Sequence, residues 1–123
     1  MIDLIKSLFT SYGYTNTELD SSDLTLYSGS TKKEEYWLLA RIDAETNVLK
    51  EQRDFFDKCA AHIESPSLEK NTSLLIVWET SGHLALETLK KKIMEIEEDA
   101  YFFKKYVLHY SPQQKNALLK ELG

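Results

Sequence analysis

The chain has 123 residues, 42% hydrophobic and 28% charged, a balance typical of one globular domain spanning residues 1–123. Its single cysteine, Cys59, excludes an internal disulfide, and its net charge of −5 opposes sequence-independent binding of nucleic acid, which depends on Lys and Arg contacts to phosphates. The N-terminus lacks the pattern of a signal peptide, and no apolar run approaches the roughly 18 residues of a membrane span, so we expect a cytoplasmic protein.

The first third of the chain is expected to form a helix and a β-hairpin. Apolar residues recur at steps of three and four over Ile2–Tyr12, and Gly13 then provides a helix stop. The polar stretch Thr15–Ser22 is interpreted as a loop. Apolar and polar residues alternate over Asp23–Ser28, and Glu35–Ile42 is aromatic and apolar, so both are predicted to be strands.

The middle of the chain predicts two helices with a strand between them. Asn47 is a good N-cap for a helix that ends near Glu64, with apolar residues spaced along one face. The apolar run in Ser73–Glu79 predicts a strand covered on both faces. A second helix is expected from Ser81 or Gly82. Its apolar stripe is Leu86, Leu89, Ile93 and Ile96.

A last strand over Phe102–Tyr110 and a terminal helix complete the predicted elements. Ser111, Pro112 and Gln114 match the cap, first position and third position of a helix N-terminus. The apolar residues of this helix are Leu118, Leu119 and Leu122. The resulting order, α-β-β-α-β-α-β-α, predicts an α/β fold, or an α+β fold, with helices packed on a mixed sheet of about four strands.

No complete catalytic or cofactor motif is present in the sequence. The stretch Ser28–Lys32 has one glycine and joins two strands, which favours a hairpin loop over a phosphate-binding loop. Cys59 and His62 are three residues apart, but a structural zinc site needs about four ligands, so Cys59 is interpreted as a core residue. We therefore expect no catalytic residue, no cofactor and no metal site.

The alternative is a restriction-type nuclease, active or degenerate, that acts on DNA. Such enzymes hold Mg²⁺ with acidic residues at adjacent strand ends, and Asp23, Asp43 and Glu79 all fall at predicted strand ends. The acid-x-lysine pair expected of this class is missing, because Lys32 and Lys33 precede the strand. Solvated turn carboxylates are the preferred interpretation of these acids.

The densest pattern of the sequence is three acids followed by four aromatic residues around a lysine pair. Adjacent aromatic residues in a strand point to opposite faces, so either both faces are covered or some rings are exposed. Core packing, a protein interface and stacking with single-stranded nucleic acid all remain open. The candidate partner-binding residues are Tyr101, Phe102, Phe103, Lys104, Lys105 and Tyr106.

The same segment carries a family resemblance. The run Glu97-Glu98-Asp99-Ala100-Tyr101-Phe102-Phe103-Lys104-Lys105-Tyr106-Val107-Leu108 resembles a signature of the middle components of bacterial ABC-three-component systems, and it is similar in this to Lamassu-type anti-phage defence systems. The residues Tyr36–Leu39 and the helix around Asp54–Phe56 are compatible with that family's layout.

This resemblance implies a small accessory subunit without an activity of its own. In such systems it accompanies an SMC-like ABC ATPase and an effector, often a nuclease, and bridges or restrains them. The implied partners are therefore proteins, with nucleic-acid contact only within the complex.

Overall fold

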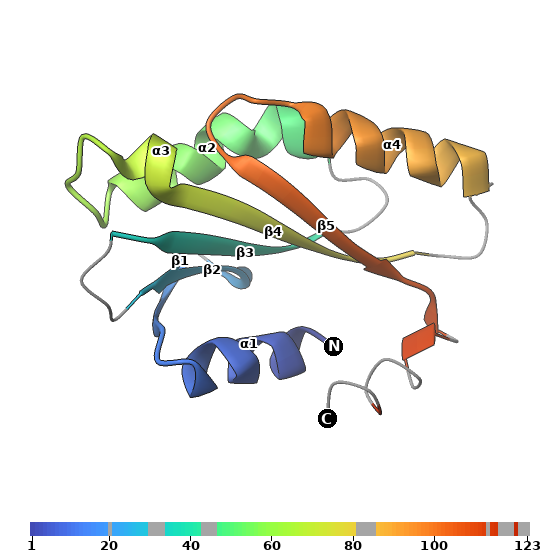
Figure 1. The fold of residues 1–123 in the computed structure, drawn as a ribbon, viewed down its shortest axis with the longest axis horizontal. Helices are drawn as coiled ribbons and strands as arrows, with labels where there is room; N and C mark the ends of the chain where they lie inside the picture. Colours follow the sequence, from blue (N-terminus) through green and yellow to red (C-terminus); the bar gives the residue numbers. More distant parts are fainter. Residues whose placement is uncertain are drawn as a thin grey trace.

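A computed structural model shows a mixed sheet with helices on both of its faces (Figure 1). It describes residues 1–19, 21–29, 34–42, 47–80, 86–112, 114–115 and 120. The helices are α1 (Ile2–Ser11), α2 (Val48–Ala60), α3 (Leu68–Asn71) and α4 (Leu86–Glu98). The strands are β1 (Thr15–Leu19), β2 (Ser21–Ser28), β3 (Tyr36–Ile42), β4 (Thr72–Glu79) and β5 (Lys104–Tyr110).

The five described strands lie in the sheet in their sequence order, β1-β2-β3-β4-β5. The first three form an antiparallel meander. The pairs β3–β4 and β4–β5 are parallel, and α2 and α4 lie in the connections between them. The fold is therefore α+β with a mixed sheet, which agrees in outline with the sequence prediction and has one strand more than the expected four or so.

One face of the sheet is covered by α2, α3 and α4 (Figure 1). Alternate residues of the strands, such as Leu38 and Leu74, point to this face and are fully buried. They pack with Val48 and Cys59 of α2 and Leu89 of α4. The apolar face predicted for α2 is confirmed as part of this cover, as are Leu89, Ile93 and Ile96 of the stripe predicted for α4. Leu86, the first residue of α4, was predicted to belong to that stripe but is 61% exposed.

Among the described helices, α1 is the one that covers the opposite face (Figure 1). Its buried core consists of Ile5 together with Tyr27, Leu39, Val77 and Tyr110 from the sheet. One helix spans only part of a five-stranded sheet. The apolar residues beyond the reach of α1 are therefore less deeply buried than their neighbours on the other face.

Strand β1 is the main difference from the sequence prediction. The stretch Thr15–Ser22 was expected to be a loop, whereas Thr15–Leu19 pairs with β2 at the edge of the sheet. An edge strand with solvent around it needs few apolar side chains, and here only Leu19 is buried. Without apolar alternation, periodicity gave no signal for a strand. The short helix α3 was also missed, and it supplies the buried Leu68.

Helix ends follow the predicted residues closely at several points. The side chain of Asn47 accepts a hydrogen bond from the Lys50 N–H at 3.2 Å, so this N-cap is confirmed. The helix ends at Ala60, earlier than the expected Glu64, because the next N–H groups turn back to the carbonyl of Cys59.

The Ser111 helix start is also confirmed. The Ser111 N–H donates to Gln114 Oε1 at 3.0 Å, and the Gln114 N–H donates to Ser111 Oγ at 3.2 Å. The expected apolar residues Leu118, Leu119 and Leu122 lie outside the described residues, as do the expected helix starts Ser81 and Gly82. Within the described part of the chain, no helix is long and apolar enough to cross a membrane.

Candidate protein-binding surface

Beside α1 the sheet is hollowed into an apolar groove of about 790 Å³, which we call the α1 groove. Helix α1 forms one wall, and β3, β4 and β5 provide the floor. The groove is lined by Ile5, Leu8, Phe9, Tyr12, Tyr14, Glu35, Trp37, Leu75, Tyr106 and Leu108. Nine of these ten side chains are apolar or aromatic, a composition suited to burying apolar groups of another molecule.

The C-terminus of α1 positions the aromatic residues at one end of the α1 groove. Gly13 has φ 86°, a conformation that glycine adopts without strain because it lacks a Cβ. The Gly13 N–H donates to the Thr10 carbonyl at 3.0 Å, and the Tyr14 N–H donates to the Phe9 carbonyl at 3.1 Å. The predicted helix stop at Gly13 is confirmed, and it leaves Tyr12 79% exposed beside the groove.

A row of four aromatic rings connects α1 with the sheet. Phe9 stacks on Tyr27 with ring centroids 4.4 Å apart. Trp37 lies 6.2 Å from Phe9 and 5.5 Å from Tyr106. The Trp37 Nε1 donates to Glu35 Oε1 at 3.1 Å, which satisfies the polar edge of the indole. The rings hold one another in position, so the groove is formed before any partner arrives.

Strand β5 divides the aromatic-basic segment between the two faces of the sheet. Tyr106 and Leu108 line the α1 groove, whereas Val107 packs against the opposite core. The Lys104 Nζ lies 5.5 Å from the centroid of the Tyr106 ring, within the range of a cation–π contact. The segment therefore contributes an aromatic ring and a cation to the end of the groove at β5.

Three of the predicted partner-binding residues are exposed. Tyr101 is 71% exposed and Tyr106 is 36% exposed, and Lys104 is exposed beside Tyr106. Phe102 is half-buried, with its ring 5.5 Å from that of Phe56. Binding of a partner by these residues stays a prediction, and Tyr106 and Lys104 are the two that adjoin the α1 groove.

Phe103 and Lys105 are buried instead. Phe103 is 2% exposed and belongs to the core under α2 and α4. Lys105 is 3% exposed, because alternation along β5 turns its side chain towards the same face. These two side chains stabilise the fold of the chain, so the surface candidates of the segment reduce to the other four.

The ammonium group of Lys105 organises the loop before β5. Its Nζ donates to Asp99 Oδ1 at 2.8 Å and contacts the carbonyls of Asp99, Tyr101 and Phe103 at 3.1, 2.7 and 3.1 Å. Phe102 adopts φ 65° within this loop, which is unfavourable for a residue with a Cβ. The lysine holds this turn closed. Because a positive φ is incompatible with an extended strand, β5 begins at Lys104 and not at the predicted Phe102.

Asp99 is the ionic partner in this arrangement. Partial burial by itself would raise the pKa of Asp99, but hydrogen bonds from Lys105, the Tyr101 N–H and Gln52 together lower the pKa below its ordinary value. The carboxylate is therefore stabilised in its charged form. Its interaction with Lys105 fixes the backbone that carries the exposed Tyr101.

The comparison with protein families decides the identity of the chain. The model of the ABC-three component (ABC-3C) system Middle Component 1 matches residues 14–122. The chain belongs to this family. The match covers all five strands and the floor of the α1 groove, and it begins just after α1. No curated protein and no solved structure matches the chain.

Membership of a three-component system implies that this middle component works with other proteins. It bears out the resemblance carried by Glu97–Leu108.

The acids of the nuclease alternative are only partly described in this middle component. Asp23 lies near the start of β2 and Glu79 at the end of β4, and both are exposed. Asp43 lies outside the described residues. Among the described residues no three acidic, histidine or cysteine side chains converge into a set that could hold a metal ion. The nuclease alternative stays an untested prediction.

Cys59 and His62 do not share a site in the middle component. Cys59 is fully buried in the core, where burial raises the pKa of its thiol to about 12. His62 lies beyond the end of α2 and is exposed. A thiol that is protonated and shielded from water is unreactive, so Cys59 acts as a core residue as expected.

Most residues of the α1 groove were not among the predicted partner-binding residues. The apolar stripe of α1 contained Leu8 and Tyr12, but its periodicity did not indicate that the sheet beneath would extend past the helix. Trp37 and Leu75 offered an indication, because their strands carry large apolar residues on both faces of the sheet.

Proposed function

We propose that this middle component is a non-catalytic accessory subunit that binds an SMC-like ABC ATPase and an effector in a bacterial anti-phage defence complex. The observation that carries the proposal is the α1 groove in a member of a three-component family. A preformed apolar surface lined with aromatic residues is typical of protein interfaces.

The composition of the groove supports a protein partner in preference to nucleic acid. Glu35 and Lys104 contribute charges of opposite sign to its surroundings, and its other residues are uncharged. A groove that follows a nucleic-acid backbone would be lined by several cations. The net charge of −5 points the same way. Contact with nucleic acid is therefore proposed only within the assembled complex.

The exposed Tyr12 at the rim of the groove is the residue expected to contribute most to the binding energy. Tyr12 projects beside an apolar wall, and burying such a side chain in an interface commonly contributes a large share of the binding energy. Since Phe9 and Trp37 are already ordered by ring contacts, binding costs little side-chain entropy at these two residues.

The proposal is tested by affinity capture. The tagged chain is expressed in the native host, and co-purifying proteins are identified by mass spectrometry. Tyr12→Ala removes an exposed ring of the groove, and Arg53→Ala, an exposed position on α2, is the matched control. Co-purification of an ABC ATPase is expected with the parent and the control. It should fall about tenfold with Tyr12→Ala.

Two results would count against the proposal. Recovery of the parent chain alone as a stable monomer contradicts an accessory role. Equal recovery of the ATPase by Tyr12→Ala and Arg53→Ala removes the α1 groove from the interface. Tyr101→Ala, tested in parallel, separates the groove from the loop before β5, and a smaller loss of partner is expected there because Tyr101 lies outside the groove.

A further inference from the structure

Strand β5 has a free side in the described sheet, because it pairs with β4 only. The Tyr110 carbonyl accepts a hydrogen bond from the Thr80 N–H at 2.8 Å, so the backbone of Tyr110 faces the β4 side. Backbone groups alternate in direction along a strand. The N–H groups of Lys105, Val107 and His109 therefore point outward, towards the free side.

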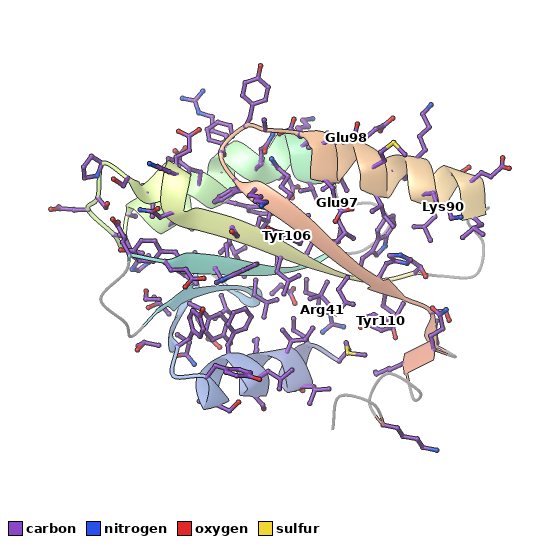
Figure 2. All side chains as sticks on the ribbon, in the orientation of Figure 1. Arg41, Lys90, Glu97, Glu98, Tyr106 and Tyr110 are labelled. Carbon is purple, nitrogen blue, oxygen red and sulfur yellow. The ribbon has the colours of Figure 1, made fainter. Side chains whose placement is uncertain are left out.

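One of these outward groups is occupied by a side chain. The Val107 N–H donates to Glu97 Oε2 at 3.2 Å, and Glu97 reaches it from the last turn of α4 (Figure 2). This carboxylate oxygen occupies the position that the carbonyl of a neighbouring strand would take. The Val107 N–H is therefore satisfied within the chain, and its acceptor is a side chain that can rotate away when another strand arrives.

A hollow of about 420 Å³ lies along the same edge, between α4 and β5. Ile93 and Met94 provide its apolar part, and Met94 is 55% exposed. Glu97 and Glu98 line the hollow at the C-terminal end of α4, Lys90 lines it about two turns earlier on the same helix, and His109 lines it from β5. The hollow gives side chains of an added strand a place to pack on the α4 side of the sheet.

The acidic residues at the end of α4 indicate which kind of strand would fit beside β5. Its last turn contains no basic residue, and it carries Glu95, Glu97 and Glu98. Acids at a helix C-terminus oppose the helix dipole, so these residues do not serve the stability of α4. Their field attracts a basic side chain instead.

We propose that the free edge of β5 binds an extended basic-apolar segment of a protein partner, which adds to the sheet as a further strand. The segment pairs with the backbone of Lys105, Val107 and His109 and displaces Glu97 from the Val107 N–H. A basic side chain then lies at Glu97 and Glu98, and an apolar side chain two positions away packs on Ile93 and Met94. The inference rests on the proposed function and names the partner's mode of binding.

A second copy of the chain fits this edge poorly. It would bring another net charge of −5 and another acidic α4 end towards the first. Like charges at an interface oppose association. The edge therefore favours a basic partner over self-pairing.

The test uses the isotopically labelled full chain and the acetylated, amidated peptide TTVTKTT, in which valine and lysine lie on one side of an extended strand. Binding is followed by NMR shifts and hydrogen exchange of the chain's amides. Peptide TTVTETT is the charge control. Val107→Pro removes the outward N–H without touching the pairing with β4, and Val107→Thr keeps that N–H in a side chain of similar shape.

The amides of Lys105, Val107 and His109 should shift and exchange more slowly with TTVTKTT. Affinity should fall about tenfold with Val107→Pro, remain unchanged with Val107→Thr, and fall about tenfold for TTVTETT. Shifts confined to the α1 groove, equal affinity for both peptides, or self-association through β5 would overturn the inference. If Val107→Pro does not fold, the parent's shifts and the peptide pair decide.

This outcome is separable from that of affinity capture. Capture of an ABC ATPase without any peptide response at β5 supports the proposed function and contradicts strand addition at the β5 edge. A peptide response at β5 without capture of an ABC ATPase supports strand addition at β5 and contradicts the proposed function.

Discussion

The two faces of the sheet are built from the same strands but are covered very differently. Under α2 and α4, strand residues such as Ile76 are sealed from water. Under α1, the neighbouring Leu75 remains half-buried and lines the α1 groove. Among the described residues, the core of one face is therefore closed, whereas the other face keeps partly exposed apolar surface.

This difference teaches where to look for function in a chain without a catalytic motif. Apolar residues on the α2–α4 face are explained by folding alone. On the α1 face, several apolar residues stay partly exposed in the described structure, and the rings of Trp37 and Tyr106 are ordered by their contact without being fully buried. Adjacent residues on a strand provide matched pairs that test this contrast, because they share a backbone and differ in face.

The largest expected effect comes from the lysine pair at the start of β5. Lys105→Met leaves Asp99 and three carbonyls without their cation, and it should lower the free energy of unfolding by about 4 kcal/mol. Lys104→Met should change it by less than about 0.5 kcal/mol, because Lys104 is exposed. Denaturant unfolding of both variants measures the difference. Equal stability of the two would contradict the buried role of Lys105.

Truncation of two neighbours in β4 should give the next largest difference. Ile76→Ala opens a cavity in a sealed core and should cost about 3 kcal/mol. Leu75→Ala widens an open groove and should cost about 1 kcal/mol. Thermal or denaturant unfolding provides the comparison. A larger cost for Leu75→Ala would mean that the α1 face is as tightly packed as the other.

The end of α1 should be sensitive to its glycine. Gly13→Ala forces a Cβ into a left-handed conformation and should cost about 1 kcal/mol. Gly13→Asn should cost less, since asparagine adopts this conformation more readily. Capture of partner proteins should weaken in parallel with the loss of stability, because Tyr12 and Tyr14 depend on the same turn. Unchanged stability of Gly13→Ala would show that the turn is adaptable.

The smallest expected effect is a dependence of stability on pH through Asp99. Its pKa is lowered in the folded chain, so its charged form stabilises the fold above the unfolded pKa of about 3.9. This contribution is lost as pH falls through the folded pKa. The free energy of unfolding of the parent and of Asp99→Asn, measured from about pH 7 to about pH 2, tests this contribution. The parent should lose more stability on acidification than Asp99→Asn. Parallel dependence of stability on pH in the two proteins would show that Asp99 does not contribute to it.

The sequence predicted those parts of the fold that depend on local chemistry. Gly13, Asn47 and Ser111 each satisfy backbone groups within a few residues, so their residue types alone indicate helix ends. The burial of Lys105 could not be foreseen, because it depends on which face β5 turns to α2 and α4 and on a carboxylate at Asp99.

The candidate site was predictable only in part for the same reason. Tyr106 and Lys104 were singled out by their aromatic-basic pattern. Tyr12 and Leu75 join them through the packing of α1 on one portion of the sheet, and no local pattern specifies that contact. The edge strand β1 escaped prediction because its solvent-facing residues carry no apolar period.

The most direct test of the central claim is amide hydrogen exchange of the chain alone and within its captured complex. Binding through the α1 groove predicts slower exchange in α1, covering residues 2–11, on assembly. Exchange in α2, covering residues 48–60, should be unchanged. Slower exchange in α2 with no change in α1 would contradict the assignment of the partner to the α1 face.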